Sequence, residues 1–217
     1  MTALFAFGVT PAVGLAASES AAQGSVERSN AEQPSAAQVS ATASPPPALL
    51  RARFEQERHV PGFNKPLRSS GEVLMIRGEG LRWETTAPFP SVMIVRGDTM
   101  RVRDAQGREQ RVGEGGGAAV PRLLQDLLGA LLAKDRVALA RHFDVEGEPT
   151  DDGSAWRMRL VPKAGPLANL YQRIEVEGTT HVERIELHGR DGGRTLLRFH
   201  DTRVAASADD AERRALD

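Results

Sequence analysis

Cysteine is absent from the 217-residue chain. This absence excludes disulfides, thiolate zinc sites and cysteine nucleophiles, and also an N-terminal lipid anchor, because lipoproteins are acylated on a cysteine. Aromatic residues make up only 5% of the chain, and 28 Lys and Arg residues balance 29 Asp and Glu residues. A chain without a basic excess is not typical of nucleic-acid readers, nor does its overall charge favour an anionic membrane surface. We therefore expect no nucleic-acid partner.

Motifs for catalysis and metal binding are also missing. None of the five histidines belongs to an H-x-x-x-H or H-E-x-x-H pair. The glycine-rich stretch 113–121 lacks the Lys-Ser/Thr of a phosphate-binding loop, and no serine lies in a G-x-S-x-G elbow. We expect no catalytic residues, no metal and no cofactor. An enzyme acting on lipid esters would need a nucleophile–base pair that the sequence does not offer.

The first 47 residues divide into two segments. Residues 1–17 are apolar and end in small residues, which is typical of a secretory signal peptide, although no basic residue precedes the apolar run. A misplaced start codon would explain that gap, and the alternative is a disordered apolar N-terminus. Residues 18–47 are rich in Ser, Ala, Gln and Pro, so they predict a disordered linker. We expect the folded domain over 48–204 and a flexible tail over 205–217.

Residues 48–60, ALLRARFEQERHV, place Leu50 and Phe54 one helical turn apart among charged residues. This spacing predicts a short amphipathic helix. The stretches that follow alternate apolar and polar residues between short breakers such as 189–193, GRDGG. Short loops join antiparallel neighbours, so these stretches predict a β-meander. The predicted strands are residues 71–78, 80–88, 91–97, 99–104, 154–163, 170–178, 181–189 and 195–204.

The middle of the chain, residues 120–143, has a helical pattern. Its leucines cover about half of a helical wheel, and Asp135 is placed to cap a second short helix that carries Val137, Leu139 and Phe143. About eight antiparallel strands with such helices predict an α+β fold. We expect an incomplete antiparallel β-barrel, a half-open curved sheet with helices plugging its concave face. The leucines of the helical pattern in residues 120–143 are Leu123, Leu124, Leu127, Leu128, Leu131 and Leu132.

The concave face of this sheet is the candidate binding site. Small-molecule sites are apolar pockets with a few polar groups, but periodicity alone favours an ordinary filled core over a ligand cavity. The predicted cavity wall consists of Val73, Met75, Leu81, Trp83, Ile94, Met158 and Leu160, with Leu124, Leu127, Leu128 and Leu131 as its roof. A purely structural domain with a dry core is the alternative.

Several short motifs occur in a characteristic order along residues 49–204. The motifs fall into two blocks, and the second block, residues 156–178, contains a Leu-x-Pro-Lys turn at 160–163. In this order the motifs resemble the LolA family of periplasmic outer-membrane lipoprotein carriers. The motifs of the first block are Phe54-x-Gln56, Gly71-x-x-Leu74, Arg77 six residues before Trp83, and Pro88.

The resemblance implies an incomplete barrel with a helical lid and a hydrophobic cavity for acyl chains. It implies a monomeric carrier without enzymatic activity that takes acylated lipoproteins from an inner-membrane transporter to an outer-membrane acceptor. It also implies that Arg77 reaches the lid and holds the empty cavity closed. The alternative for Arg77 is a solvent-facing strand cation.

Two departures from the family pattern are visible. Gly78 stands where the family commonly has proline after the arginine, and the chain ends soon after its last predicted strand. We therefore identify the chain as a divergent member. The alternative function is that of a chaperone for a non-protein lipid, or for a polyene or glycolipid intermediate of an export or biosynthetic system.

Overall fold

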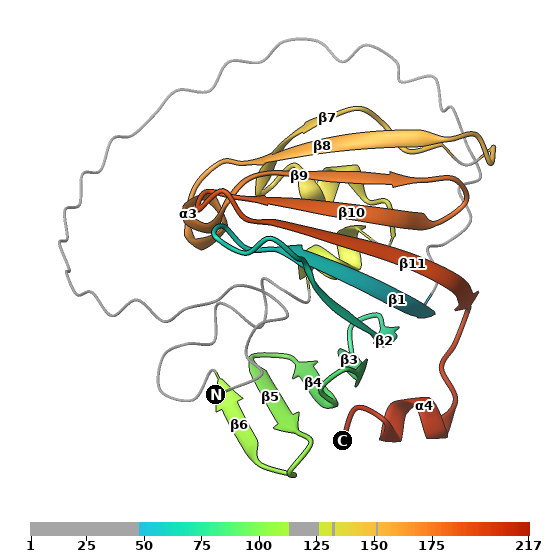
Figure 1. The fold of residues 1–217 in the computed structure, drawn as a ribbon. Helices are drawn as coiled ribbons and strands as arrows, with labels where there is room; N and C mark the ends of the chain where they lie inside the picture. Colours follow the sequence, from blue (N-terminus) through green and yellow to red (C-terminus); the bar gives the residue numbers. More distant parts are fainter. Residues whose placement is uncertain (1–47, 113–125, 132, 151) are drawn as a thin grey trace, which may run out of the picture.

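The computed structural model describes residues 48–112, 126–131, 133–150 and 152–217 (Figure 1). The predicted signal peptide and linker, together with Leu123, Leu124 and Leu132, lie outside the described residues. No helix among the described residues is long and apolar enough to cross a membrane.

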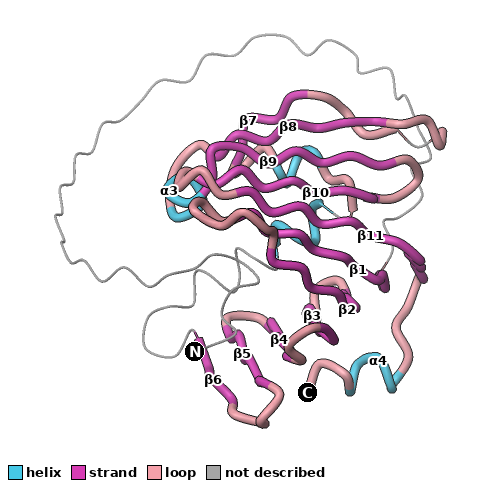
Figure 2. The backbone as a smooth tube through the Cα atoms, in the orientation of Figure 1, coloured by secondary structure: helices cyan, strands magenta, loops and turns pink. Residues whose placement is uncertain are grey.

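The described chain forms one open, antiparallel sheet of eleven strands in the order β6-β5-β4-β3-β2-β1-β11-β10-β9-β8-β7. The prediction of an incomplete antiparallel barrel is confirmed. Figure 2 shows the strands as one curved layer with short helical segments behind it and at its ends. The strands are β1 Leu49–His59, β2 Leu67–Ile76, β3 Gly80–Ala87, β4 Ser91–Arg96, β5 Thr99–Asp104, β6 Glu109–Val112, β7 Phe143–Glu146, β8 Trp156–Pro162, β9 Tyr171–Gly178, β10 Val182–Gly189 and β11 Arg194–Ala205.

Two meanders, β1–β6 and β7–β11, are joined where the first strand pairs with the last. β1 is antiparallel to β11 from Leu49 opposite Ala205 to His59 opposite Arg194. β1 also pairs with β2, so its backbone is hydrogen-bonded on both edges. The two meanders therefore share one curved surface.

The helix predicted over 48–60 is wrong, because this segment is strand β1. Leu50, Ala52 and Phe54 are buried, whereas Arg51 and Arg53 between them are exposed. A spacing of four residues satisfies both the helical period and the strand period. Ala52, a small apolar residue midway between Leu50 and Phe54, is the feature that distinguishes a strand from a helix here.

The helical segment in the middle of the chain is confirmed over 126–131. Asp135 caps α2 (Arg136–Leu139) as expected, since its carboxylate accepts a hydrogen bond from the backbone N–H of Ala138 at 2.9 Å. Two of the residues assigned to this helix differ from the prediction, Val137 because it faces solvent on α2 and Phe143 because it lies outside the helix. Val137 is 76% exposed, and Phe143 is the buried first residue of β7, a strand that periodicity did not reveal.

The predicted flexible tail is instead an ordered segment that ends in α4 (Asp210–Arg214). Asp209 and Glu212 form a capping box at its start, with both hydrogen bonds at 2.7 Å. Beyond the helix, Leu216 is buried against the convex face of the sheet. Its apolar neighbours there are Leu49, Leu74, Ile76 and Ala208. Those strand residues point away from the concave face, so they require a cover of their own.

Aromatic side chains lie over glycines at two places on the concave face. Phe54 is opposite Gly71, and Trp156 is opposite Gly178. A Cβ on Gly71 would lie 1.8 Å from the backbone oxygen of Glu84 and 2.9 Å from the Phe54 ring. Strand glycines allow such close approach and sharp bending, so these pairs help the sheet to curve around its core. The short helix α3 (Pro166–Leu170) connects β8 to β9.

The first prediction concerns Gly71. Gly71→Ala is expected to lower the free energy of unfolding by about 3 kcal/mol, because the new methyl group overlaps backbone that cannot move aside. Gly129→Ala is the matched control. Nothing lies within 4 Å of a Cβ at Gly129, so alanine there should raise helix stability by about 1 kcal/mol. Urea unfolding followed by circular dichroism measures both, and an unchanged Gly71→Ala variant would contradict the close approach.

Candidate functional site

The concave face of the sheet is lined by apolar side chains from both meanders. The six predicted wall residues that lie on it are between 0 and 6% exposed, and they belong to one continuous core cluster. They are Val73, Met75, Leu81, Trp83, Met158 and Leu160. The structure therefore brings together residues that are more than seventy positions apart in the chain.

Ile94, the seventh predicted wall residue, is a correction. It is only half-buried, and it lies opposite Arg82 on the convex face. Its neighbours Met93 and Val95 point to the concave side instead, with Met93 directly opposite Trp83. The strand has apolar residues at four consecutive positions, so alternation alone does not identify its inner face.

The predicted roof is formed by the helical segment 126–131, which we call the lid. Leu127, Leu128 and Leu131 are between 5 and 8% exposed and belong to the same core cluster as the sheet residues. Leu124, the remaining predicted roof residue, lies outside the described residues. The lid therefore places three leucines against the concave face.

A group of three aromatic rings lies at the junction of the two meanders. The Phe54 and Trp83 ring centroids are 4.3 Å apart, and the Phe199 ring meets Trp83 edge-on at 6.3 Å. Sequence reasoning had Trp83 as wall but missed Phe54, which it placed on a helix, and Phe199. The alternation of Leu197 and Phe199 in β11 was the signal available for the latter.

The concave face offers almost no polar chemistry. Among the described buried residues, the polar ones are Gln56, Glu186 and Glu212, and only Gln56 shares the concave side with Phe54. An amide is neither a nucleophile nor a proton donor of useful pKa. What this face can do chemically is bind apolar groups.

Arg77 lies in the turn between β2 and β3 and is exposed. Its backbone N–H donates to the oxygen of Ala48 at 2.8 Å. No described residue receives a hydrogen bond or an ion pair from its guanidinium. The turn continues into Glu79, which pairs with Arg213 of α4 at 3.1 Å. The predicted contact between Arg77 and the lid stays a prediction.

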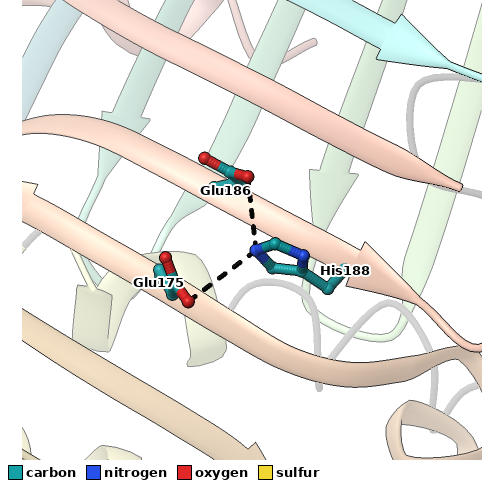
Figure 3. A group of neighbouring side chains, drawn as sticks. All are labelled: Glu175, Glu186 and His188. Carbon is teal, nitrogen blue, oxygen red and sulfur yellow. Dashed lines mark ion pairs between the residues drawn. The ribbon is translucent and has the colours of Figure 1, made fainter. Parts of the chain in front are cut away.

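The convex face carries a cluster of titratable groups on β9 and β10, shown in Figure 3. Single ligand atoms of Glu175, Glu186 and His188 all lie within 4.8 Å of one another. Nε2 of His188 is 3.3 Å from Oε1 of Glu186 and 3.8 Å from Oε1 of Glu175. This atom is buried and has no hydrogen-bond partner among the described residues. The donor types match those of a divalent cation site.

Arginines around this cluster argue against a cation there. Arg173 lies 2.8 Å from Glu175, and both Arg184 and Arg194 pair with Glu186. Each carboxylate is thus already neutralised, and three guanidinium groups would repel an approaching cation. The cluster is better described as an ion-pair network on the outer surface of the sheet.

Burial lowers the pKa of His188 below its ordinary value, and the nearby Arg173 lowers it further. Glu186 and Glu175 act in the opposite direction without reversing the shift. The folded protein therefore favours the neutral imidazole.

A surface crevice of about 330 Å³ lies between the ends of β3, β4 and β5. Thr86, Pro90 and Asp104 are among its lining residues, and none of the predicted wall residues borders it. Its lining includes the charged residues Glu84, Arg103 and Asp104, unlike the concave face. The candidate site is therefore the concave face beneath the lid.

The described chain is thus an open antiparallel half-barrel whose apolar concave face lies under a short helical lid. A family model described as "Outer membrane lipoprotein carrier protein LolA" matches residues 48–212. The chain belongs to the LolA family.

Two relatives are named outer-membrane lipoprotein carrier protein. The one from Dechloromonas aromatica is 28% identical over 150 residues, which cover 69% of this chain and 68% of that protein. The one from Methylococcus capsulatus is 27% identical over 164 residues, which cover 74% of this chain and 73% of that protein.

Solved structures with a related arrangement are more distant. A LolA superfamily protein from Nitrosomonas europaea is 11% identical, with a TM-score of 0.38 over 76% of this chain and 90% of that chain. A DUF1329 family protein from Desulfovibrio piger is 13% identical, with a TM-score of 0.41 over 76% and 89%.

The second prediction follows from the lowered pKa of His188. The unfolded chain binds a proton at this imidazole more readily than the folded protein does, so stability should fall as the pH drops below the ordinary histidine pKa of about 6.5. His188→Gln should weaken this loss. His200→Gln, at an exposed position of β11, is the control. Urea midpoints between neutral and mildly acidic pH measure the effect, and an equal loss in all three proteins would contradict it.

Proposed function

We propose that this protein carries acyl chains of lipoproteins in a cavity between the concave face and the lid. The observation that carries the proposal is the apolar face itself, buried under three leucines and holding a single buried polar residue, Gln56, among the described residues. Such a site binds and releases an apolar ligand without covalent chemistry, so the protein acts as a carrier and not as an enzyme. Membership of the LolA family supports this role.

Exchange of the lid for an acyl chain is energetically balanced. Exposing Leu127, Leu128 and Leu131 costs about 1.5–3 kcal/mol for each side chain. Burying about ten methylene groups of an acyl chain returns about 8 kcal/mol, at 0.8 kcal/mol each. The two sums are similar, so a chain can displace the lid and the lid can help to expel it. A carrier requires this near-equality, because it must release what it binds.

The route of the cargo follows from the family and from the absence of cysteine. The predicted signal peptide at residues 1–17 would direct the chain to the periplasm. There it would receive an acylated lipoprotein from an inner-membrane transporter and pass it to an outer-membrane acceptor. Because the chain has no cysteine to acylate, it fits the mobile carrier rather than an acceptor anchored through lipid.

The third prediction compares two neighbouring residues of β4 on opposite faces of the sheet. Met93→Trp fills space on the concave side, so the affinity for a fluorescent fatty acid should fall about tenfold or more, the equivalent of losing two methylene contacts. Ile94→Trp places the same side chain on the convex face and should leave affinity within about twofold. Titration of the delipidated protein measures both.

A control separates lost binding from lost folding. Met93→Ala removes volume from the same position, so it should retain or increase fatty-acid binding although it lowers stability by about 2–5 kcal/mol. Circular dichroism establishes that each variant is folded before titration. If Met93→Trp and Ile94→Trp bind equally well, or if the wild-type protein takes up no fatty acid, the cavity does not exist and the core is dry.

The fourth prediction concerns Arg77 as the latch of the lid. A guanidinium that donates to the free carbonyls of a helix end would contribute about 1–3 kcal/mol. Arg77→Leu should then retain more cargo during purification without detergent from the periplasm. Mass spectrometry before and after organic extraction measures the bound species. Equal cargo in both proteins would assign Arg77 to the solvent-facing alternative, and a small lipid in place of an acylated protein would favour the chaperone function.

A further inference from the structure

Three large apolar side chains are exposed at the ends of neighbouring strands. Phe63, in the connection from β1 to β2, is 71% exposed, and Leu67, the first residue of β2, is 58% exposed. Phe89, between β3 and β4, is 76% exposed. We call these three residues the apolar rim. Large apolar side chains left in water at adjacent loops are typical of an interaction site.

The sheet register brings the members of the rim to the same end of the sheet. In the β2–β3 pair, Ser70 is opposite Ala87. Leu67 lies three residues before Ser70, and Phe89 lies two residues after Ala87, so both project beyond the same pair. The opposite end of these strands carries the turn with Arg77, next to α4. The rim is therefore separated from the C-terminal helix by the length of the strands.

The charged residues in the loops of the rim are all basic. Residues 60–70 contain Lys65 and Arg68 and no acidic residue, and residues 85–91 contain no charged residue. Lys65 is exposed, and the side chain of Arg68 is 74% exposed although it pairs with Glu57 at 3.3 Å. The acids nearest in the β3–β5 part of the sheet, Glu84 and Asp104, are each 2.7 Å from an arginine. A cation beside exposed aromatics is complementary to an anionic lipid surface.

The shape of the rim favours a bilayer over a protein groove. Phe63 and Phe89 stand at the tips of separate loops, and each loop contains two prolines, at 61 and 66 and at 88 and 90. Proline limits the backbone freedom that would be lost on insertion. Separate, stiff apolar tips enter a deformable interface without requiring a matching surface, and aromatic rings favour the headgroup region.

We propose that the apolar rim docks this protein on the surface of a lipid bilayer that contains anionic lipids. Phe63, Leu67 and Phe89 enter the interfacial region, and Lys65 lies at the level of the headgroups. Docking at this end keeps α4 and the Arg77 turn directed away from the membrane. The partner is the bilayer itself, so this inference goes beyond the proposed cargo and does not depend on it.

The fifth prediction tests the rim by flotation of the full chain with vesicles. The double variant Phe63→Ser and Phe89→Ser should bind mixed phosphatidylcholine–phosphatidylglycerol vesicles at least about tenfold more weakly, because it lacks the two rings that the bilayer would bury. Lys65→Gln should lower binding to these vesicles about fivefold while leaving binding to pure phosphatidylcholine unchanged. All positions are exposed, so the variants should fold as the wild type does.

Val137→Ser is the matched control, because Val137 on α2 is as exposed as Phe89 but lies outside the rim. It should bind vesicles like the wild type. Each protein retains residues 1–17, so any binding by that apolar segment is common to all. Fatty-acid affinity of the double variant should stay unchanged, which separates membrane docking from cargo binding. Absence of wild-type flotation with either vesicle, or equal flotation of the double variant, would overturn the proposal.

Discussion

The pairing of β1 with β11 is the constraint on which the rest of the structure depends. It connects the first and last strands along the chain, and Arg53 and Asp201, which form an ion pair across it, are 148 residues apart in the sequence. Without it, the two meanders would be separate sheets, each with an apolar face open to water. With it, Trp83 of the first meander meets Phe199 of the second. The concave face is therefore a product of a contact between distant parts of the chain.

The two faces of the sheet serve different physical requirements. The concave face excludes charge, so burial there depends on apolar area and on the fit of side chains such as Phe54 over Gly71. The convex face of β9 to β11 instead has arginine and glutamate on neighbouring strands, as in the pairs of Glu177 with Arg184 and of Glu186 with Arg194. These pairs are partly exposed, and their main effect is to keep the outer surface hydrated and to define the register between neighbouring strands. Among the described residues, the inner face has the continuous apolar area that the proposed cargo would require.

The fold class and most of the strands could be predicted because alternation and short turns are local properties. The hairpin at 189–193 is an example, where the N–H of Gly189 donates to the oxygen of Gly193 at 2.8 Å. β1 could not be assigned in the same way, because Leu50 and Phe54 satisfy two periods and only pairing with β2 and β11 selects the strand. The prediction that Ile94 lies on the concave face was wrong for a related reason. Met93 and Val95 beside it are equally apolar, and the register with Trp83 decides which side of β4 faces inward.

The sequence by itself determined that the chain has no thiol chemistry, that its charge is balanced and that an apolar half-open sheet meets a leucine-rich helix. These are consequences of composition and of periods of two and 3.6 residues, which are readable along the chain. Tertiary structure decided that the tail becomes α4, because Leu216 finds Leu49, Leu74 and Ile76 only once the strands are paired. It also decided that Leu67 and Phe89 lie at the same end of the sheet, because this position depends on how β2 pairs with β3. Neighbourhood in space depends on strand register, and register is set by many weak contacts acting together.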